Sequence, residues 1–326
     1  MKRIFLLILL FLVFRNGYTQ VVRGSILDKS DNKKIDFASV YINGTSTGTH
    51  SDQKGYFELD ITKNGSLPLT ISALGYYTVT LTDFSSEKQI EVYLIPKTFE
   101  LEEVVVSARS TAKARKTNMK NFKDQFLGSG YNGQNCVITN EGDISFKNSG
   151  DTLKAYASKP ILIVNNALGY KIIYYLDKFE YCWKCKTFLY KGNAFFSEDM
   201  ASKMTRKTFF DKRRENAYLG SRSHFFASLW ANKLKLNGYT IKNLTDQTLN
   251  YEDIVVERTG FKKYLSYKGI LYISYLSGSQ NSAIELIKSP VFFDGSGYFD
   301  GSGVTVIGQM AKQRIGDFLP YDFSLK

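Results

Sequence analysis

The chain has 326 residues, of which 43% are hydrophobic and 15% aromatic, and its net charge is +12. This composition excludes a disordered chain, and the length suits about two domains. The 22 Tyr and 24 Phe, against only 5 Pro, favour a strand-rich fold. The positive charge predicts peripheral contact with anionic surfaces such as a membrane, although the basic residues are spread along the chain.

Residues 1–19 have the pattern of a secretory signal peptide. Lys2 and Arg3 precede an uninterrupted apolar run over residues 4–14, which is too short to span a bilayer. The alternative is a core element at the N-terminus. We expect cleavage before Gln20, which would remove three basic residues and lower the net charge to +9. The expected location is the periplasm or the outer membrane, where nucleic acid is not a partner.

Residues 20–97 have the pattern of a β-sandwich. Short alternating segments are separated by polar or glycine-containing turns, as all-β sandwiches require. The expected strands cover residues 21–27, 38–42, 55–59, 69–73, 77–81 and 90–94. A polar loop is expected over residues 49–54, and His50 is expected in it as a surface residue.

Six blocks in this region carry a specific resemblance. They are Gly24-x-Ile26-x-Asp28, Ile35-x-Phe37-Ala38-x-Val40-x-Ile42, Gly44-Thr45, Gly48-Thr49-x-x-Asp52-x-x-Gly55-x-Phe57, residues 71–76 (ISALGY), and Val92-x-Leu94. In this order they resemble the carboxypeptidase-regulatory-like family. The resemblance implies a transthyretin-like, seven-stranded Greek-key sandwich. Such domains accompany zinc carboxypeptidases and the N-termini of TonB-dependent outer-membrane transporters.

The chain lacks the residues of a zinc carboxypeptidase. That chemistry needs two His, an acidic ligand and a catalytic Glu around one metal. The only histidines are His50 and His224, and neither begins an HxxE motif. We therefore expect no enzymatic activity, no metal and no cofactor. If another activity existed, its candidate residues would be His224, Arg213, Arg214 and Asp317.

Residues 98–120 are expected to be a linker strand and a basic helix. Val104, Val105 and Val106 form the strand, which resembles the segment of TonB-dependent transporters that contains the energy-coupling box. Such a box adds a strand to a partner's sheet. The alternative is a strand that docks on this protein's own second domain. The helix, over residues 111–126, has a basic face that could contact anionic lipid or simply water.

Residues 121–326 are expected to form an α+β domain with a helical insertion over residues 197–237. Strands are expected on both sides of the insertion, so the fold class is mainly β. Before the insertion we expect them over residues 136–139, 144–147, 152–157, 161–165, 170–179 and 188–196. After it we expect them over residues 254–257, 265–268, 270–276, 283–287, 290–293 and 304–307, with a short strand at 298–299. This half resembles uncharacterised exported proteins that carry the same sandwich.

A dense polar and aromatic block precedes one helix of the insertion. Its candidate interaction residues are Arg213, Arg214, Tyr218 and His224, and Ser221 is expected to cap the helix. The block is compatible with a functional pocket or with an internal network that anchors the helix to the sheet.

Cys182 and Cys185 form a CxxC pair within an expected strand or hairpin. In an oxidising compartment they are candidates for a local disulfide. The alternatives are structural thiols, a redox motif formed by the pair, or a metal site that would also need Cys136 and the two histidines.

The sequence favours a non-enzymatic binding or adaptor protein, accessory to an outer-membrane or periplasmic protein complex. The alternative is a component that binds a glycan or a peptide for a TonB-dependent nutrient-uptake system.

Overall fold

The computed structural model describes residues 20–97, 112–198, 204–258 and 262–325. The chain divides into two compact units, which are described separately below. The first consists of Met1–Tyr41 and Thr47–Pro96, and the second of Ile42–Ser46 and Lys97–Lys326. The expected signal peptide at residues 1–19 lies outside the described residues. So do Val104, Val105 and Val106 of the expected linker strand.

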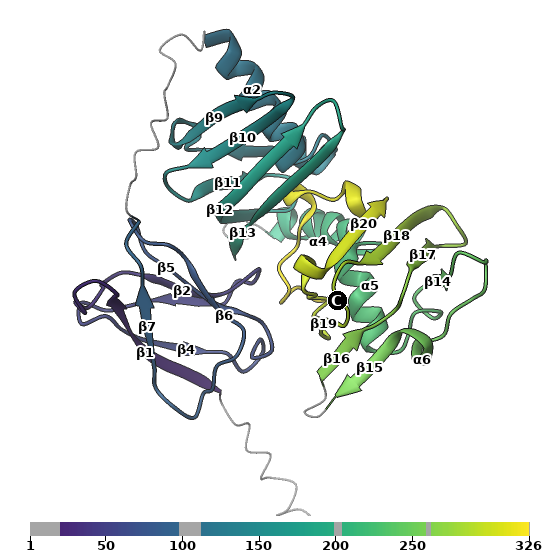
Figure 1. The fold of residues 1–326 in the computed structure, drawn as a ribbon, viewed down its shortest axis with the longest axis horizontal. Coiled ribbons are helices and arrows are strands. Elements are labelled where there is room, and N and C mark those ends of the chain that lie inside the picture. The colour runs from purple at the N-terminus through teal and green to yellow at the C-terminus, as the bar shows by residue number, and fades with distance from the viewer. Residues whose placement is uncertain (1–19, 98–111, 199–203, 259–261, 326) are drawn as a thin grey trace, which may run out of the picture. The chain divides into compact units, whose positions relative to one another are not determined.

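The first unit is a sandwich of seven strands in two sheets (Figure 1). One sheet has the order β4-β1-β7 and the other the order β3-β2-β5-β6. Strand β1 pairs with β4 in the antiparallel direction and with β7 in the parallel direction. The strands are β1 (Val21–Asp28), β2 (Ser39–Ile42), β3 (Gly48–His50), β4 (Tyr56–Asp60), β5 (Leu69–Ser72), β6 (Val79–Leu81) and β7 (Ile90–Leu94). The expected seven-stranded sandwich is confirmed.

Alternation places the core of this unit. In β4, Phe57 and Leu59 are buried while Glu58 and Asp60 are exposed, as the period of two requires. The turn before β4 depends on Asp52 and Gly55, two residues of the sequence block described above. The Asp52 carboxylate accepts hydrogen bonds from the backbone N–H groups of residues 54 and 56. Gly55 has φ +70°, and a Cβ there would lie 2.8 Å from a carbonyl oxygen of β1.

The second unit begins with a helix packed on a six-stranded sheet. The helix α2 (Ala112–Phe126) buries Met119, Phe122 and Phe126 in the core of this sheet. The sheet order is β8-β11-β12-β10-β9, and β13 pairs with β12. The short helix α3 (Tyr131–Gln134) precedes the sheet. Its strands are β8 (Cys136–Ile138), β9 (Ile144–Ser149), β10 (Thr152–Ala157), β11 (Ile161–Asn165), β12 (Tyr170–Cys182) and β13 (Thr187–Ser197).

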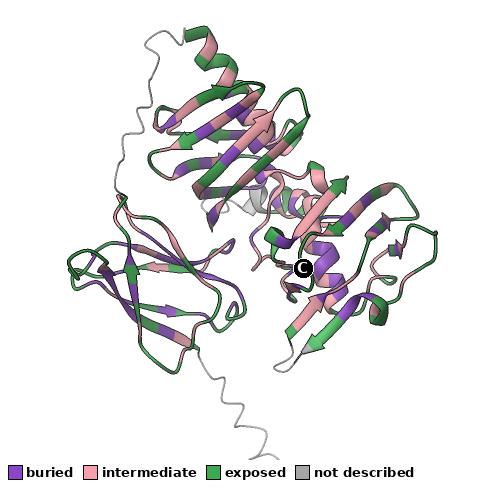
Figure 2. Ribbon diagram, in the orientation of Figure 1, coloured by how far each residue is buried: buried purple, intermediate pink, exposed green. Residues whose placement is uncertain are grey.

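Helices α4 (Met204–Tyr218) and α5 (Arg222–Trp230) follow and lead into a second core. Ser221 caps α5, since its hydroxyl accepts a hydrogen bond from the His224 N–H at 3.0 Å. Phe225, Phe226 and Leu229 of α5 are completely buried against the strands that follow (Figure 2). The two sheets here have the orders β14-β17-β18-β20 and β15-β16-β19. Their elements are β14 (Tyr239–Lys242), α6 (Tyr251–Ile254), β15 (Val255–Arg258), β16 (Lys262–Leu265), β17 (Ile270–Tyr275), β18 (Gln280–Leu286), β19 (Val291–Phe293) and β20 (Val304–Gly308).

The C-terminal segment joins the two cores of this unit. Its 3₁₀ turns η3 (Met310–Lys312) and η4 (Ile315–Asp317) follow β20. Met310 is buried in the second core and Ile315 in the first. The Gly316 N–H donates to the Leu127 carbonyl at 3.0 Å, and a Cβ on Gly316 would lie 2.6 Å from that oxygen. The polar residues between Met310 and Ile315 therefore lie between the two hydrophobic cores of the unit.

The structure confirms the expected class, mainly β with a helical insertion in an α+β region. Details differ at several places, and the strand expected over residues 265–268 covers Lys262–Leu265 instead. Residues 49 and 50, expected in a loop, belong to β3 beside β2, and residues 239–242 form the unexpected β14. Residues 298 and 299 were expected as a strand, but only a single bridge joins Phe299 to Phe293. No helix among the described residues has the length and hydropathy to cross a membrane.

Candidate functional site

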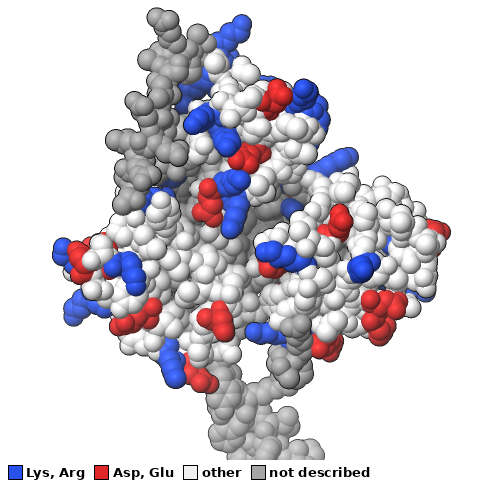
Figure 3. All heavy atoms as spheres, in the orientation of Figure 1, with Lys and Arg blue, Asp and Glu red and all other residues white. Residues whose placement is uncertain are grey.

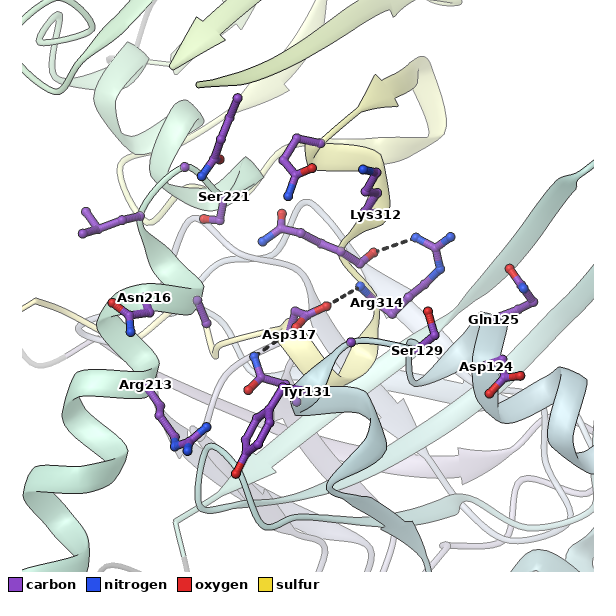
Figure 4. A pocket seen from close by; sticks show the side chains of 18 residues that line it. Asp124, Gln125, Ser129, Tyr131, Arg213, Asn216, Ser221, Lys312, Arg314 and Asp317 are labelled. Atoms are coloured by element: carbon purple, nitrogen blue, oxygen red, sulfur yellow. Dashed lines mark hydrogen bonds between the residues drawn. The ribbon is translucent and has the colours of Figure 1, made fainter. Parts of the chain in front are cut away.

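A polar pocket of about 600 Å³ lies in the second unit, between α3, α4 and the C-terminal segment (Figure 4). Arg213 and Asn216 reach it from α4, Tyr131 from α3, and Asp317 from η4. Six of its lining side chains are carboxamides: Gln125, Asn132, Asn216, Gln280, Gln309 and Gln313. The side chains of Gln125, Asn216, Gln280 and Gln309 make no hydrogen bond to another described residue. Each therefore offers a free donor and a free acceptor.

The floor of the pocket is fixed by Asp317. One carboxylate oxygen accepts a hydrogen bond from the Asn132 side chain at 3.0 Å, and the other accepts from the Arg314 N–H at 3.3 Å. Gln313 is fixed as well, because its side-chain oxygen accepts from the Arg222 N–H at the start of α5 at 3.0 Å. These bonds join segments far apart in the sequence into one rigid surface.

The Arg314 side chain contacts carbonyls of the C-terminal segment and one ring of β13. Its guanidinium lies 3.7 Å above the Phe188 ring and donates to the carbonyls of Ala311 and Gln313. Burial lowers the pKa of Arg314 below its ordinary value. The Arg314 Nε–H is buried and has no hydrogen-bond partner among the described residues.

Arg213 lies close to two aromatic rings at the pocket wall. Its guanidinium carbon is 4.1 Å from the centre of the Tyr131 ring and 4.3 Å from the centre of the Phe209 ring. Its Nε–H is buried without a partner among the described residues. Within the same part of the chain, the guanidinium forms no hydrogen bond or ion pair. The two rings restrict the position of the guanidinium, and its N–H groups remain without a partner among the described residues.

The adjacent Arg214 has a different environment. It is 4% exposed, and it donates to the Leu168 and Gly169 carbonyls at 2.8 and 3.3 Å. It also forms an ion pair with Glu198 and lies 4.1 Å from the centre of the Tyr170 ring. Arg214 therefore anchors α4 to the turn between β11 and β12.

Tyr218 and His224 lie on a second hollow of about 450 Å³. The His224 Nδ1 accepts a hydrogen bond from the Gly220 N–H at 3.2 Å, and the Tyr239 hydroxyl lies 3.0 Å from it. This geometry assigns the proton to Nε2. Burial lowers the pKa of His224 to about 4, so the ring is neutral at pH 7.

The four predicted interaction residues of the insertion are thus divided. Arg213 lines the polar pocket, Arg214 lies in the interior, and Tyr218 and His224 line the second hollow. The candidate residues Val104, Val105 and Val106 are outside the described residues. Asp317, named above as a candidate for another activity, is at the floor of the polar pocket beside structural partners.

The remaining predicted group is the cysteine pair. Cys182 and Cys185 are joined in a disulfide at the turn between β12 and β13. Cys136 is a buried thiol, and burial raises its pKa to about 12. Within the described ranges, no group of three or more His, Cys, Asp and Glu side chains could hold a metal ion.

Sequence reasoning missed Tyr131, Lys312 and the carboxamides of the pocket. The available signal was a local excess of amides, as in Asn132, Gln134 and Asn135. Asn and Gln are common in loops for reasons unrelated to ligands, so this signal does not separate a pocket from a turn.

The family comparison finds a match that lies mainly in the first unit. Residues 22–106 match the family model of the CarboxypepD_reg-like domain, and no curated protein matches the chain. A cohesin–X-dockerin complex from Acetivibrio cellulolyticus is 22% identical over 23% of this chain, with a TM-score of 0.19. The match spans 51% of that chain, about half its length.

Two solved structures match most of the chain. A candidate membrane-associated protein of unknown function from Bacteroides fragilis is 9% identical, with a TM-score of 0.19, and the match covers 89% of this chain and 94% of that one. A candidate carbohydrate-binding protein from Bacteroides uniformis is 9% identical, with a TM-score of 0.20, over 88% and 98%. Such low scores carry no inference about function. The first unit is thus similar in sequence to the CarboxypepD_reg-like domain, and it has the β-sandwich fold described above.

Proposed function

We propose that this protein is a non-enzymatic binding protein of the cell envelope, whose second unit binds a polar ligand in the pocket beside α4. The observation that carries this proposal is the set of four unpaired carboxamides around a fixed floor. A pocket of about 600 Å³ lies within the usual size range of small-molecule sites.

The chemistry of the lining favours a saccharide over a peptide. A sugar hydroxyl both donates and accepts hydrogen bonds, and a carboxamide offers one group of each kind. Tyr131 is 56% exposed, so part of its ring is available to the apolar face of a sugar. The pocket has few apolar side chains, chiefly Ala217 and Leu219, that could receive the apolar side chains of a peptide.

The envelope setting rests on the sequence. The signal-peptide pattern supports export to the periplasm or the outer membrane. The CarboxypepD_reg-like domain supports an adaptor role in which the first unit docks on an outer-membrane or periplasmic complex, such as a TonB-dependent uptake system. On the face shown in Figure 3, basic side chains lie among acidic ones, which favours weak peripheral contact with an anionic membrane over a strong one. Recovery of the protein alone from membranes in mild detergent would contradict the adaptor role.

Ligand binding is tested by calorimetry and thermal shift with panels of oligosaccharides and peptides. A saccharide at about 100 times its Kd should add about 2.7 kcal/mol to the free energy of unfolding. Asn216→Trp, at an exposed position of α4, should fill the pocket and abolish the effect. Glu215→Trp is the matched control, because residue 215 is also exposed on α4 but does not line the pocket. Equal binding by the Asn216→Trp variant, or no shift with any saccharide, would contradict the proposal.

A further inference from the structure

The Arg213 guanidinium has more donors than the structure uses. Arginine carries five N–H groups in one plane, and none of those of Arg213 bonds to another described residue. The guanidinium carbon lies 4.1 Å from the centre of the Tyr131 ring and 4.3 Å from that of Phe209, and neither ring accepts a conventional hydrogen bond from its N–H groups. The Nε–H is buried, so bulk water cannot satisfy it. The N–H groups of the two terminal nitrogens, which are not buried, are therefore the donors available to a ligand.

The remaining charged groups of the pocket do not pair with these donors. The Asp317 carboxylate already accepts from the Asn132 side chain and the Arg314 N–H. Asp124 pairs with Lys120 at 2.6 Å on α2. The Lys312 ammonium at the rim forms no ion pair with any residue that the structure describes. The pocket therefore has more unpaired positive charge than unpaired negative charge among its described residues.

We infer that the pocket recognises the carboxylate of an acidic saccharide, such as a uronate unit, and that the Arg213 guanidinium binds it. The inference rests on the proposed function and names the class of its ligand. A carboxylate presents two oxygens in one plane, which matches the planar N–H fork of a guanidinium. The free carboxamides bind the sugar hydroxyls, and Lys312 adds a second positive charge at the rim. A sulfate ester shares the negative charge but not the planar pair of oxygens.

The test compares each acidic saccharide with its neutral form on the intact mature protein. The probes are oligomers of galacturonate, glucuronate and mannuronate, their methyl esters, and sulfated neutral oligomers of the same length. Calorimetry should show at least one uronate binding roughly tenfold or more tighter than its ester, as expected for a charge-assisted hydrogen-bonded pair. This preference should fall with added salt, whereas the affinity for the ester should not.

Arg213→Gln should reduce the preference to about twofold or less, because it removes the positive charge that distinguishes the uronate from its ester. Arg213→Lys keeps the charge without the fork and should retain an intermediate preference. Lys212→Gln is the matched control, since residue 212 is exposed on the same helix, outside the pocket, and loses the same charge. It should behave as the unaltered protein.

The outcomes separate the two proposals. Equal binding of uronates and esters, both blocked by Asn216→Trp, overturns the carboxylate inference and leaves the binding function intact. A full preference in Arg213→Gln, or tight binding of sulfated oligomers without uronates, overturns it as well. No binding of any saccharide overturns both proposals.

Discussion

The interior of the second unit and its polar pocket each contain an arginine of α4, and the two arginines differ in their hydrogen bonding. Arg214 is 4% exposed and donates to two backbone carbonyls and Glu198. Arg213, the preceding residue, leaves its whole N–H edge without a partner among the described residues. Neighbouring residues of a helix point about 100° apart, so one turns inward and the other toward the pocket. Similar residues at adjacent positions can thus serve the fold in one case and a ligand in the other.

The largest effect on stability is expected at Arg214. Arg214→Met removes the donors of the Leu168 and Gly169 carbonyls and should lower the free energy of unfolding by about 3 kcal/mol or more. Urea unfolding followed by tryptophan fluorescence measures this in the second unit, because both tryptophans, Trp183 and Trp230, belong to it. If Arg214→Met lowered the free energy of unfolding less than Arg213→Met does, the assignment of Arg214 to the interior and Arg213 to the pocket would be wrong.

His224 extends the comparison to pH. The folded ring has a pKa of about 4, against about 6.5 when unfolded, so the unfolded chain binds more protons between these values. The contribution of the neutral His224 ring to the free energy of unfolding is complete above pH 6.5. It is lost as the pH falls toward 4, by roughly 3 kcal/mol at most. Urea unfolding at pH 7 and pH 4.5 should show the decrease, and His224→Asn should reduce it. Since only His50 and His224 are present, NMR titration assigns the folded pKa directly; a value near 6.5 would refute this account.

The floor of the pocket depends on a close backbone approach at Gly316. A Cβ there would lie 2.6 Å from the Gly133 Cα and from the Leu127 carbonyl oxygen. Gly316→Ala should therefore cost about 1–3 kcal/mol and weaken ligand binding by displacing Asp317. Gly130→Ala is the control in the same region, because its Cβ would meet nothing within 4 Å. Equal melting temperatures for the two variants would show that the C-terminal segment is not tightly seated.

The smallest effect on stability is expected in the pocket itself. Arg213→Met loses the stacking on Tyr131 and Phe209 but no hydrogen bond to a described residue. It should cost less than about 1 kcal/mol in the same urea experiment. A cost like that of Arg214→Met would place Arg213 in the structural interior and remove the distinction between the two regions.

Much of the fold follows from local patterns in the sequence. Alternation in β4, with Phe57 and Leu59 inward, and the cap at Ser221 are decided by neighbouring residues, and both are predictable. Strand β14 is short and has only two buried side chains, Tyr239 and Ile241, so its pattern is too brief to separate it from the preceding helical section.

The pocket could not be predicted in the same way. Asn132 and Asp317 are 185 residues apart and meet only because the C-terminal segment bridges the two cores. The sequence grouped Arg213, Arg214, Tyr218 and His224 as one block. The rotation of α4 and the start of α5 then distribute them over two surfaces and the interior. Arg214 is paired because it reaches the Leu168 and Gly169 carbonyls, and Arg213 does not. No local sequence pattern gives the positions of these carbonyls.

The most direct test of the central claim is an NMR titration of the two arginine Nε–H groups in the intact mature protein. Addition of the uronate oligomer that binds best by calorimetry should shift the Arg213 Nε–H signal. The Arg214 signal should stay in place, because its Nε–H already donates to the Leu168 carbonyl at 2.8 Å. The methyl ester should leave both signals nearly unchanged. Saturated binding of the uronate without a shift at Arg213 would contradict the account.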